Sequence, residues 1–322
     1  MDAFTQIFGF AFQYLDSAAY LILAALGLSI IFGMMGVINM AHGELMMIGA
    51  YITAFCMYGG IPAPIAILLA GVGAGIAGMI LERLIIRHFY KQLLSSLVVT
   101  WGLSMIISQV FLIMFGPNMP SLPTPFSDIK ILVGGEVGFA LVGAEGFARV
   151  TGETGRMPPG VESFGIYRLV MFAVAVLMVV AVWLLLRKTE FGARARATMD
   201  NPTMANALGI STPRIYAYTF GLGSALAGIA GGLFALTSAI TPYFGAAYTA
   251  RAFITVVVGG AAGVINGLVA SVAALGGVQT ILSNLFSVYI GFVGMIAAAF
   301  LILLVMPTGI SGYMEKLRGR SR

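Results

Sequence analysis

The chain has 322 residues, of which 60% are hydrophobic and 9% are charged, and its formal net charge is +5. An ordinary soluble domain carries about 25% charged residues, so this composition excludes a water-covered globular protein. The positive residues stand in short clusters between apolar runs and therefore do not indicate nucleic-acid binding. The single cysteine, Cys56, excludes an internal disulfide.

Long apolar runs without charges follow one another along the chain. A helix needs about 20 apolar residues to cross a bilayer, and every backbone polar group must be satisfied internally there. The runs are continuous rather than alternating, which excludes an outer-membrane barrel. They cover residues 17–36, 40–58, 62–81, 93–116, 169–186, 215–240, 252–282 and 285–306. We predict an all-α polytopic membrane helix bundle of eight to nine transmembrane helices, some broken by glycine, forming one domain over residues 1–322.

Lysine and arginine gather at 83–91, 187–214 and 316–322. Cytoplasmic loops carry an excess of these residues, so we place all three clusters in the cytoplasm of a bacterial inner membrane. The segment 117–165, rich in Pro, Gly and acids, is then an external loop, ordered in part at best. An external N-terminus and a cytoplasmic C-terminus require run 252–282 to form two short spans, which favours nine crossings.

The first residues allow two interpretations. The stretch 5–14, TQIFGFAFQY, is either a short amphipathic helix in the membrane interface or an ordinary lead-in to the first span.

A polar segment interrupts the apolar sequence at 33–44, GMMGVINMAHGE. Glycine permits breaks in a helix, and ionisable groups at membrane depth normally face a cavity or the bundle interior. Many transporters build substrate sites from such broken helices. We predict a discontinuous helix near a translocation path; the alternative is that His42 and Glu44 lie at a membrane boundary with structural hydrogen bonds. For His42 alone we favour a structural role, and a metal site is poorly supported because the only other histidine is His88.

A second glycine-rich segment is 259–267, GGAAGVING. Four glycines in nine residues disfavour an uninterrupted helix. Small residues also let helices approach closely, which is a sufficient alternative explanation.

The segment 187–214 is polar and lies between two spans. Asn201 and Pro202 are suited to the cap and first position of a short helix, and Gly209 to its end. Met204, Ala205 and Leu208 would then share one face, which could dock in a partner's groove. The alternative is a solvated connecting loop.

None of the lysines follows a glycine, so the chain lacks the phosphate-binding Gly-Lys-Ser/Thr loop of an ATPase. It also lacks the Gly-x-Ser-x-Gly and His-Glu-x-x-His patterns of hydrolases. We expect no enzymatic activity and no cofactor in this chain; if transport is driven by ATP, a separate protein binds it.

The stretch Leu26–Tyr51, LGLSIIFGMMGVINMAHGELMMIGAY, resembles permease subunits of ATP-binding-cassette importers for branched-chain amino acids and for urea or short amides. The resemblance recurs in the family's order over nearly the whole chain, at Val99–Ser104, Ala193–Ile210, Thr219–Gly232, Phe253–Gly263 and Met306–Ile310.

The resemblance implies a transport assembly and two sets of functional residues. The assembly would contain a second related permease, two cytoplasmic ATPase subunits and a periplasmic substrate-binding protein, and would import a small neutral or zwitterionic solute. The candidates for the translocation path are Asn39, Ala41, His42, Gly43, Glu44, Gly259 and Gly260. The candidates for coupling to an ATPase are Arg194, Arg196, Asp200, Asn201, Met204, Ala205, Leu208 and Gly209.

Two other classes of function compete with this interpretation. A stand-alone channel or secondary transporter would need no ATPase, and 187–214 would be a linker. An intramembrane enzyme using His42 and Glu44 ranks last, because no convincing nucleophile or second histidine accompanies them.

Overall fold

The computed structural model describes residues 3–320 except 91, 135–137, 152–157, 159–160 and 262. Lys91 and Arg322 of the basic clusters lie outside the described residues. The elements in chain order are α1 (Ala3–Met35), α2 (His42–Tyr58), α3 (Ala63–Leu84), the 3-10 helix η1 (Ile86–Phe89), α4 (Leu93–Phe115), β1 (Lys130–Gly134), β2 (Gly138–Val142), α5 (Ala144–Thr151), β3 (Glu162–Gly165), α6 (Ile166–Lys188), α7 (Glu190–Asp200), α8 (Pro202–Ala207), α9 (Thr212–Ala235), α10 (Phe244–Gly259), α11 (Val264–Leu285), α12 (Val288–Val305) and α13 (Gly309–Arg320).

The prediction of a polytopic helix bundle is confirmed. In the described part of the chain, 7 helical stretches are long and apolar enough to cross a membrane. They contain α1, α3, α4, α6, α9, α11 and α12. The shorter helices α2 and α10 complete the bundle, so the number of spans roughly matches the predicted eight to nine.

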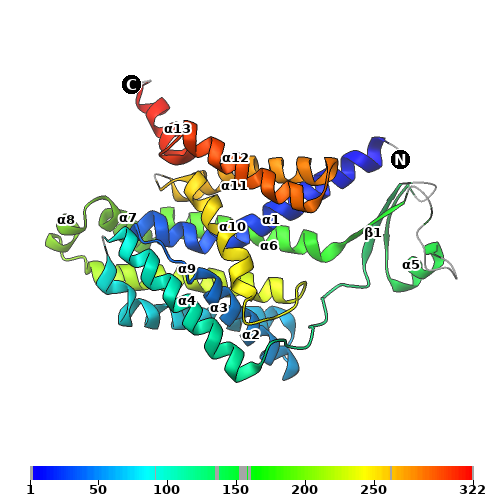
Figure 1. Cartoon of the computed structure of the whole chain (residues 1–322), viewed down its shortest axis with the longest axis horizontal. Helices are drawn as coiled ribbons and strands as arrows, with labels where there is room; N and C mark the ends of the chain where they lie inside the picture. Colours follow the sequence, from blue (N-terminus) through cyan, green and yellow to red (C-terminus); the bar gives the residue numbers. More distant parts are fainter. Residues whose placement is uncertain are drawn as a thin grey trace.

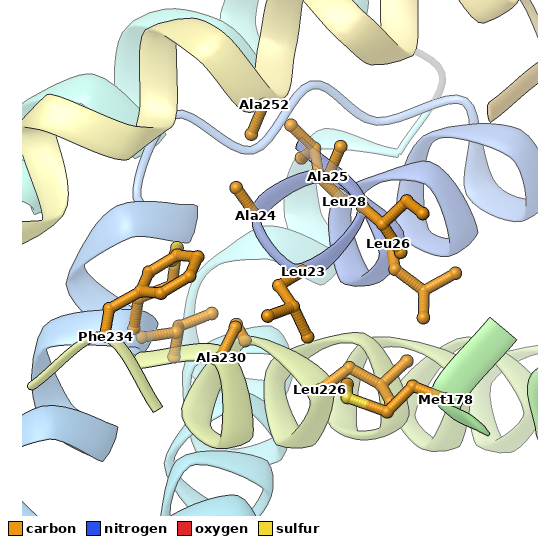
Figure 2. Close-up of a cluster of buried hydrophobic side chains, with 14 of the residues drawn as sticks. Leu23, Ala24, Ala25, Leu26, Leu28, Met178, Leu226, Ala230, Phe234 and Ala252 are labelled. Atoms are coloured by element: carbon orange, nitrogen blue, oxygen red, sulfur yellow. The ribbon is translucent and has the colours of Figure 1, made fainter. Parts of the chain in front are cut away.

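Helix α1 lies at the centre of the bundle and packs against α6, α9, α10 and α11. Figure 2 shows Leu23, Leu26 and Leu28 of α1 among side chains of the surrounding helices, including Leu226 and Phe234 of α9. The outer helices expose large apolar side chains along their length instead, as expected for surfaces that face lipid.

Glycines bring α2, α3 and α9 into direct backbone contact. A Cβ atom at Gly49 of α2 would overlap the backbone of Gly228 on α9, so the two helices cross at a distance that only glycine allows. Close approach through small residues is a common way to pack helices in a bilayer.

The bundle has two distinct ends, and the basic clusters gather at the end that carries α8 (Figure 1). Arg83 and Arg214, from the first and second clusters, line one hollow there. Arg196 and Glu315, from the second cluster and α13, line another. This common placement is what the positive-inside rule requires, and the same rule predicts that the α8 end is cytoplasmic.

The opposite end carries a three-stranded antiparallel sheet in the order β2-β1-β3. The segment 117–165, predicted to be an external loop ordered in part at best, thus contains three short strands and the helix α5 among its described residues. Ile131 and Val133 of β1 and Phe164 of β3 form a small core with Phe12 of α1, whose ring centroid lies 4.7 Å from that of Phe164. Because α1 is continuous from Ala3, residues 5–14 are a lead-in to the first span, one of the two predicted alternatives.

Candidate functional site

The predicted break in the first apolar region is present. Helix α1 ends at Met35, Gly36 has a φ of 63°, and α2 begins only at His42. A φ of this sign is the left-handed conformation that glycine adopts at no steric cost. Six residues lie between the helices, and the amides of Met40 and Ala41 within them are satisfied by side chains instead of by a helix.

Two side chains satisfy part of this backbone. Oδ1 of Asn39 accepts a hydrogen bond of 3.1 Å from the amide of Ala41. Oγ1 of Thr100 on α4 accepts one of 2.9 Å from the amide of Met40 and lies 3.3 Å from the carbonyl oxygen of Ile38. The segment is therefore held in a fixed extended path, with Asn39 and Ala41 buried in it.

His42 is fully buried, and its Nε2 donates a hydrogen bond of 3.0 Å to the carbonyl oxygen of Ala24 on α1. A carbonyl only accepts, so Nε2 carries the proton and Nδ1 does not. This bond fixes the start of α2 against α1, as the favoured structural interpretation of His42 expects.

Glu44 is also buried, in the first turn of α2. One carboxylate oxygen accepts a hydrogen bond from the hydroxyl of Ser104 on α4. The polar face of α4 thus holds both the extended segment, through Thr100, and the first turn of α2, through Ser104.

Gly43 lies where α2 crosses α10. A Cβ atom at Gly43 would overlap the carbonyl group of Gly245 and the hydroxyl of Thr249. Its role in the structure is therefore close packing of the broken helix on α10.

The structure does not bring Gly259 and Gly260 to this place. They end α10, about 22 Å from Gly245 at 1.5 Å per helical residue. Gly260 has a φ of 81°, and a Cβ atom there would meet the Thr308 carbonyl at 2.7 Å. The predicted break between α10 and α11 is present, but it packs on the turn between α12 and α13. The residues predicted for the translocation path therefore form two separate groups.

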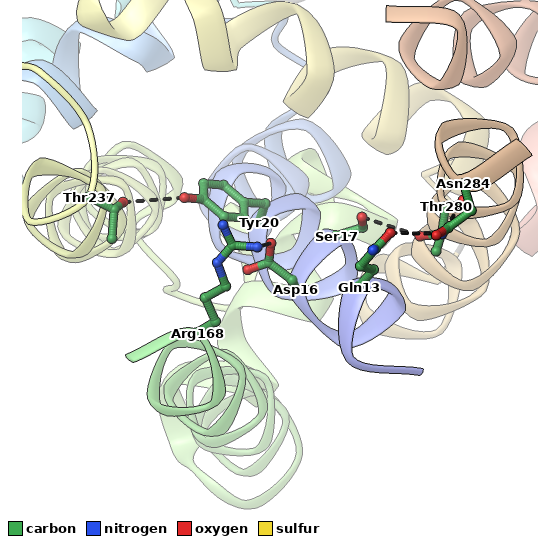
Figure 3. Close-up of polar contacts among 8 residues, drawn as sticks. All are labelled: Gln13, Asp16, Ser17, Tyr20, Arg168, Thr237, Thr280 and Asn284. Carbon is green, nitrogen blue, oxygen red and sulfur yellow. Dashed lines mark hydrogen bonds and ion pairs between the residues drawn. The ribbon is translucent and has the colours of Figure 1, made fainter. Parts of the chain in front are cut away.

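A polar cavity at the sheet end was not predicted from the sequence. It has a volume of about 540 Å³ and is lined by Gln13, Asp16, Ser17, Tyr20, Leu21, Ala24, Arg168, Tyr248, Arg251, Gln279, Ser283, Asn284 and Val288. Nη1 of Arg168 lies 3.0 Å from Oδ2 of Asp16 (Figure 3). Charged groups inside a membrane bundle normally mark a substrate pathway or a paired structural contact.

The sequence did contain a signal for this cavity. Asp16, Arg168 and Arg251 each stand one residue before an apolar run, where a single charge resembles the boundary of a span. Because α1, α6 and α10 all begin earlier than the runs, the three charges lie inside helices instead. All three side chains line the same cavity, although Asp16 and Arg251 lie well inside α1 and α10 and only Arg168 lies in the first turn of its helix.

The coupling candidates lie on two short helices at the α8 end. Thr189 caps α7 by accepting from the Gly192 amide, and Asn201 caps α8 by accepting from the Met204 amide at 3.0 Å. Gly209, with a φ of 83°, follows the end of α8. The predicted cap, first position and helix end at 201–209 are confirmed.

One detail of that prediction was wrong. Met204 and Leu208 are 59% and 73% exposed, but Ala205 is buried. Successive residues of a helix point about 100° apart, so Ala205 faces the bundle while Met204 and Leu208 face outward. Arg194, Arg196 and Asp200 are exposed on α7, where Arg194 pairs with Glu190 at 2.8 Å and Arg196 donates to the Leu186 carbonyl.

Among the described residues no group of three or more His, Cys, Asp or Glu side chains is placed to hold a metal ion. A bundle of apolar spans, a broken helix in its interior and a polar cavity together define a multi-pass membrane transport protein.

The chain belongs to the family of permease components of branched-chain amino acid transport systems, whose model matches residues 10–306. It is similar to the high-affinity branched-chain amino acid transport system permease protein LivH of Escherichia coli (strain K12), with 31% identity over 91% of each chain. It is 27% identical to the corresponding BraD of Pseudomonas aeruginosa, over 91% of this chain and 92% of that one. No solved structure matches the chain.

The protein is therefore a multi-pass permease subunit of an ATP-binding-cassette importer in the bacterial inner membrane, and it is not an enzyme. The comparisons support the resemblance to branched-chain amino acid permeases found in Leu26–Tyr51. The urea and short-amide permeases belong only to the broader group that the sequence resembles.

Proposed function

We propose that this chain forms part of the import path for a branched-chain amino acid. In this proposal it pairs with a second related permease, two cytoplasmic ATPase subunits drive the motion, and a periplasmic binding protein delivers the solute. The relatives' names concern branched-chain amino acids, and a cavity with both charge signs suits a zwitterion better than it suits urea.

The observation that carries the coupling part of the proposal is the construction of α8. Its inner residue Ala205 is buried, and the side chain of Asn206 accepts bonds of 3.2 and 2.9 Å from the amide and hydroxyl of Thr212 on α9. Met204 and Leu208 project from this fixed base. A firmly held helix that offers two flexible apolar side chains is suited to a partner's groove.

The mechanism that we infer is alternating access. Closure of the ATPases displaces α7 and α8, and the displacement passes to α6 and α9, which join them directly. Because α1 and α2 pack on α9 through glycine contacts, the broken helix would move with it. The proposed hinge of this path consists of Asn39, Ala41, His42, Gly43 and Glu44. Gly259 and Gly260 are proposed to support it at the α8 end.

The test is ATP-driven uptake of leucine by vesicles that contain the complete assembly. Leu208→Asp should abolish uptake and leave assembly of the two permeases intact, because a charge cannot be buried in an apolar groove. Leu317→Asp places the same charge at an exposed leucine of α13 and should leave uptake unchanged. Wild-type uptake by Leu208→Asp would refute the coupling role. Uptake by the purified single chain without ATP would instead establish a stand-alone transporter.

A further inference from the structure

We propose that the polar cavity at the sheet end binds the charged head of an α-amino acid, with its carboxylate at Arg251 and its ammonium at Asp16. This inference rests on the proposed function, since it names the site at which the imported amino acid is held inside the permease.

Arg251 lies within α10, among apolar helices, and its guanidinium carbon is 4.8 Å from the centre of the Phe292 ring. Its Nε is buried without a hydrogen-bond partner, and among the described residues no carboxylate lies within 4.0 Å of it. A charge at membrane depth is costly and is normally paired. Carboxylates match the forked donors of arginine, so a carboxylate on the solute would supply the missing partner.

Within the described part of the chain, only one of the two carboxylate oxygens of Asp16 has a partner. Its Oδ2 pairs with Arg168, while its Oδ1 is buried and has no partner among the described residues. An ammonium group donates up to three hydrogen bonds and complements such an oxygen. One carboxylate, of Asp16, and two guanidinium groups, of Arg168 and Arg251, line the cavity. Because the net charge of these groups is positive, a carboxylate is the first requirement of the ligand and an ammonium group the second.

The remaining walls divide into a polar and an apolar part. On the polar side, Nδ2 of Asn284 donates to Gln13 at 2.7 Å and Thr280 contacts Ser17 at 3.3 Å, which ties α11 to α1 (Figure 3). Leu21 and Ala24 contribute apolar surface from α1. An aliphatic side chain could lie there while the charged head faces Arg251 and Asp16.

Specific side-chain contacts hold the walls of the cavity in place. Tyr20 and Tyr248, which line it, both stack on the ring of Phe234, with centroids 4.7 and 4.6 Å from its centroid. Its volume of about 540 Å³ lies within the range of small-molecule sites. Ala24 lines the cavity and also accepts the hydrogen bond of His42, so the cavity reaches the start of the broken helix.

The first experiment measures ATP-driven leucine uptake at saturating, substrate-loaded binding protein. Arg251→Gln and Asp16→Asn should each reduce uptake about tenfold, the scale of one lost charge-assisted hydrogen bond. Lys316→Gln and Asp128→Asn remove equivalent charges outside the cavity and should have no effect. If wild-type protein imports no leucine, the proposed function fails. If it does, and both cavity variants import at the wild-type rate, the site fails while the function stands.

The second experiment separates binding from a folding defect. Asn284→Cys in a Cys56→Ala background places a thiol at the cavity wall, in the assembly without binding protein. Leucine should slow its modification by a charged thiol reagent, whereas leucinamide, which lacks the carboxylate, should not, and 4-methylpentanoate, which lacks the amine, should protect less. Adding Arg251→Gln should remove the protection. Equal protection by leucine and leucinamide, or none by leucine, would overturn the proposal.

Discussion

The amide of Met40 donates a hydrogen bond to the Thr100 hydroxyl across the interface between the broken helix and α4. The two residues come from separate stretches of the family resemblance, Leu26–Tyr51 and Val99–Ser104. An otherwise peripheral helix thus contributes a polar contact to the centre of the candidate path.

Replacing Thr100 tests this contact. Thr100→Val keeps the shape of the side chain but leaves the partly buried Met40 amide without its acceptor, which costs up to about 1–3 kcal/mol. We expect a lower thermal midpoint of the purified assembly and reduced uptake, while Thr100→Ser should behave as wild type. Equal midpoints for the valine and serine variants would show that the hydroxyl does not hold the segment.

The crossing of α2 and α10 makes a prediction for glycine. Gly43→Ala inserts a methyl group into the Gly245 backbone, so the helices must separate and folding or assembly should fail. Gly102→Ala on α4 is the matched control, because a Cβ atom there meets nothing within 4 Å. It should be neutral or stabilise the helix by up to about 1 kcal/mol. Normal yield and uptake of Gly43→Ala would contradict the observed packing.

The sheet is predicted to depend on its small core with α1. Phe12→Ala should destabilise the attachment by about 3–5 kcal/mol, the usual cost of truncating a buried phenylalanine. Limited proteolysis should then cut within 117–165 much faster than in wild-type protein. Phe4→Ala, on the exposed side of the same helix, should leave the cleavage rate unchanged; the same acceleration in both variants would rule out a specific role for Phe12.

The cap of α8 should influence coupling more than assembly. Asn201→Ala removes the acceptor of the Met204 amide and destabilises the short helix by about 1 kcal/mol. We expect slower leucine uptake per ATP hydrolysed, measured in the same vesicles, and recovery with Asn201→Ser, which also caps helices. An unchanged ratio of uptake to hydrolysis in the alanine variant would argue against a rigid α8 as the coupling element.

The helices were predictable because apolar run length and glycine breaks act locally. The end of α1 near Gly36, the end of α10 at Gly259 and the cap at Asn201 all follow from preferences of single residues. The clustering of Lys and Arg also predicted which segments share one end of the bundle.

What was missed depends on contacts between distant segments. The strands of 117–165 are short, and they pack on Phe12 of α1, which is far from them in the sequence. The cavity was hidden because Asp16, Arg168 and Arg251 each resemble the boundary of a span when taken alone. Only the common direction of α1, α6 and α10 brings the three charges together.

The most direct measurement is cross-linking from α8 in the native assembly. Met204 and Leu208 are each replaced by cysteine in a Cys56→Ala background, and Phe139 of β2 is replaced as the reference at the sheet end. Both α8 positions should form cross-links to an ATPase subunit and should resist an impermeant thiol reagent added outside the cell, whereas position 139 should react with that reagent. Labelling of position 208 from outside, or the absence of any cross-link from α8 to an ATPase, would contradict the account.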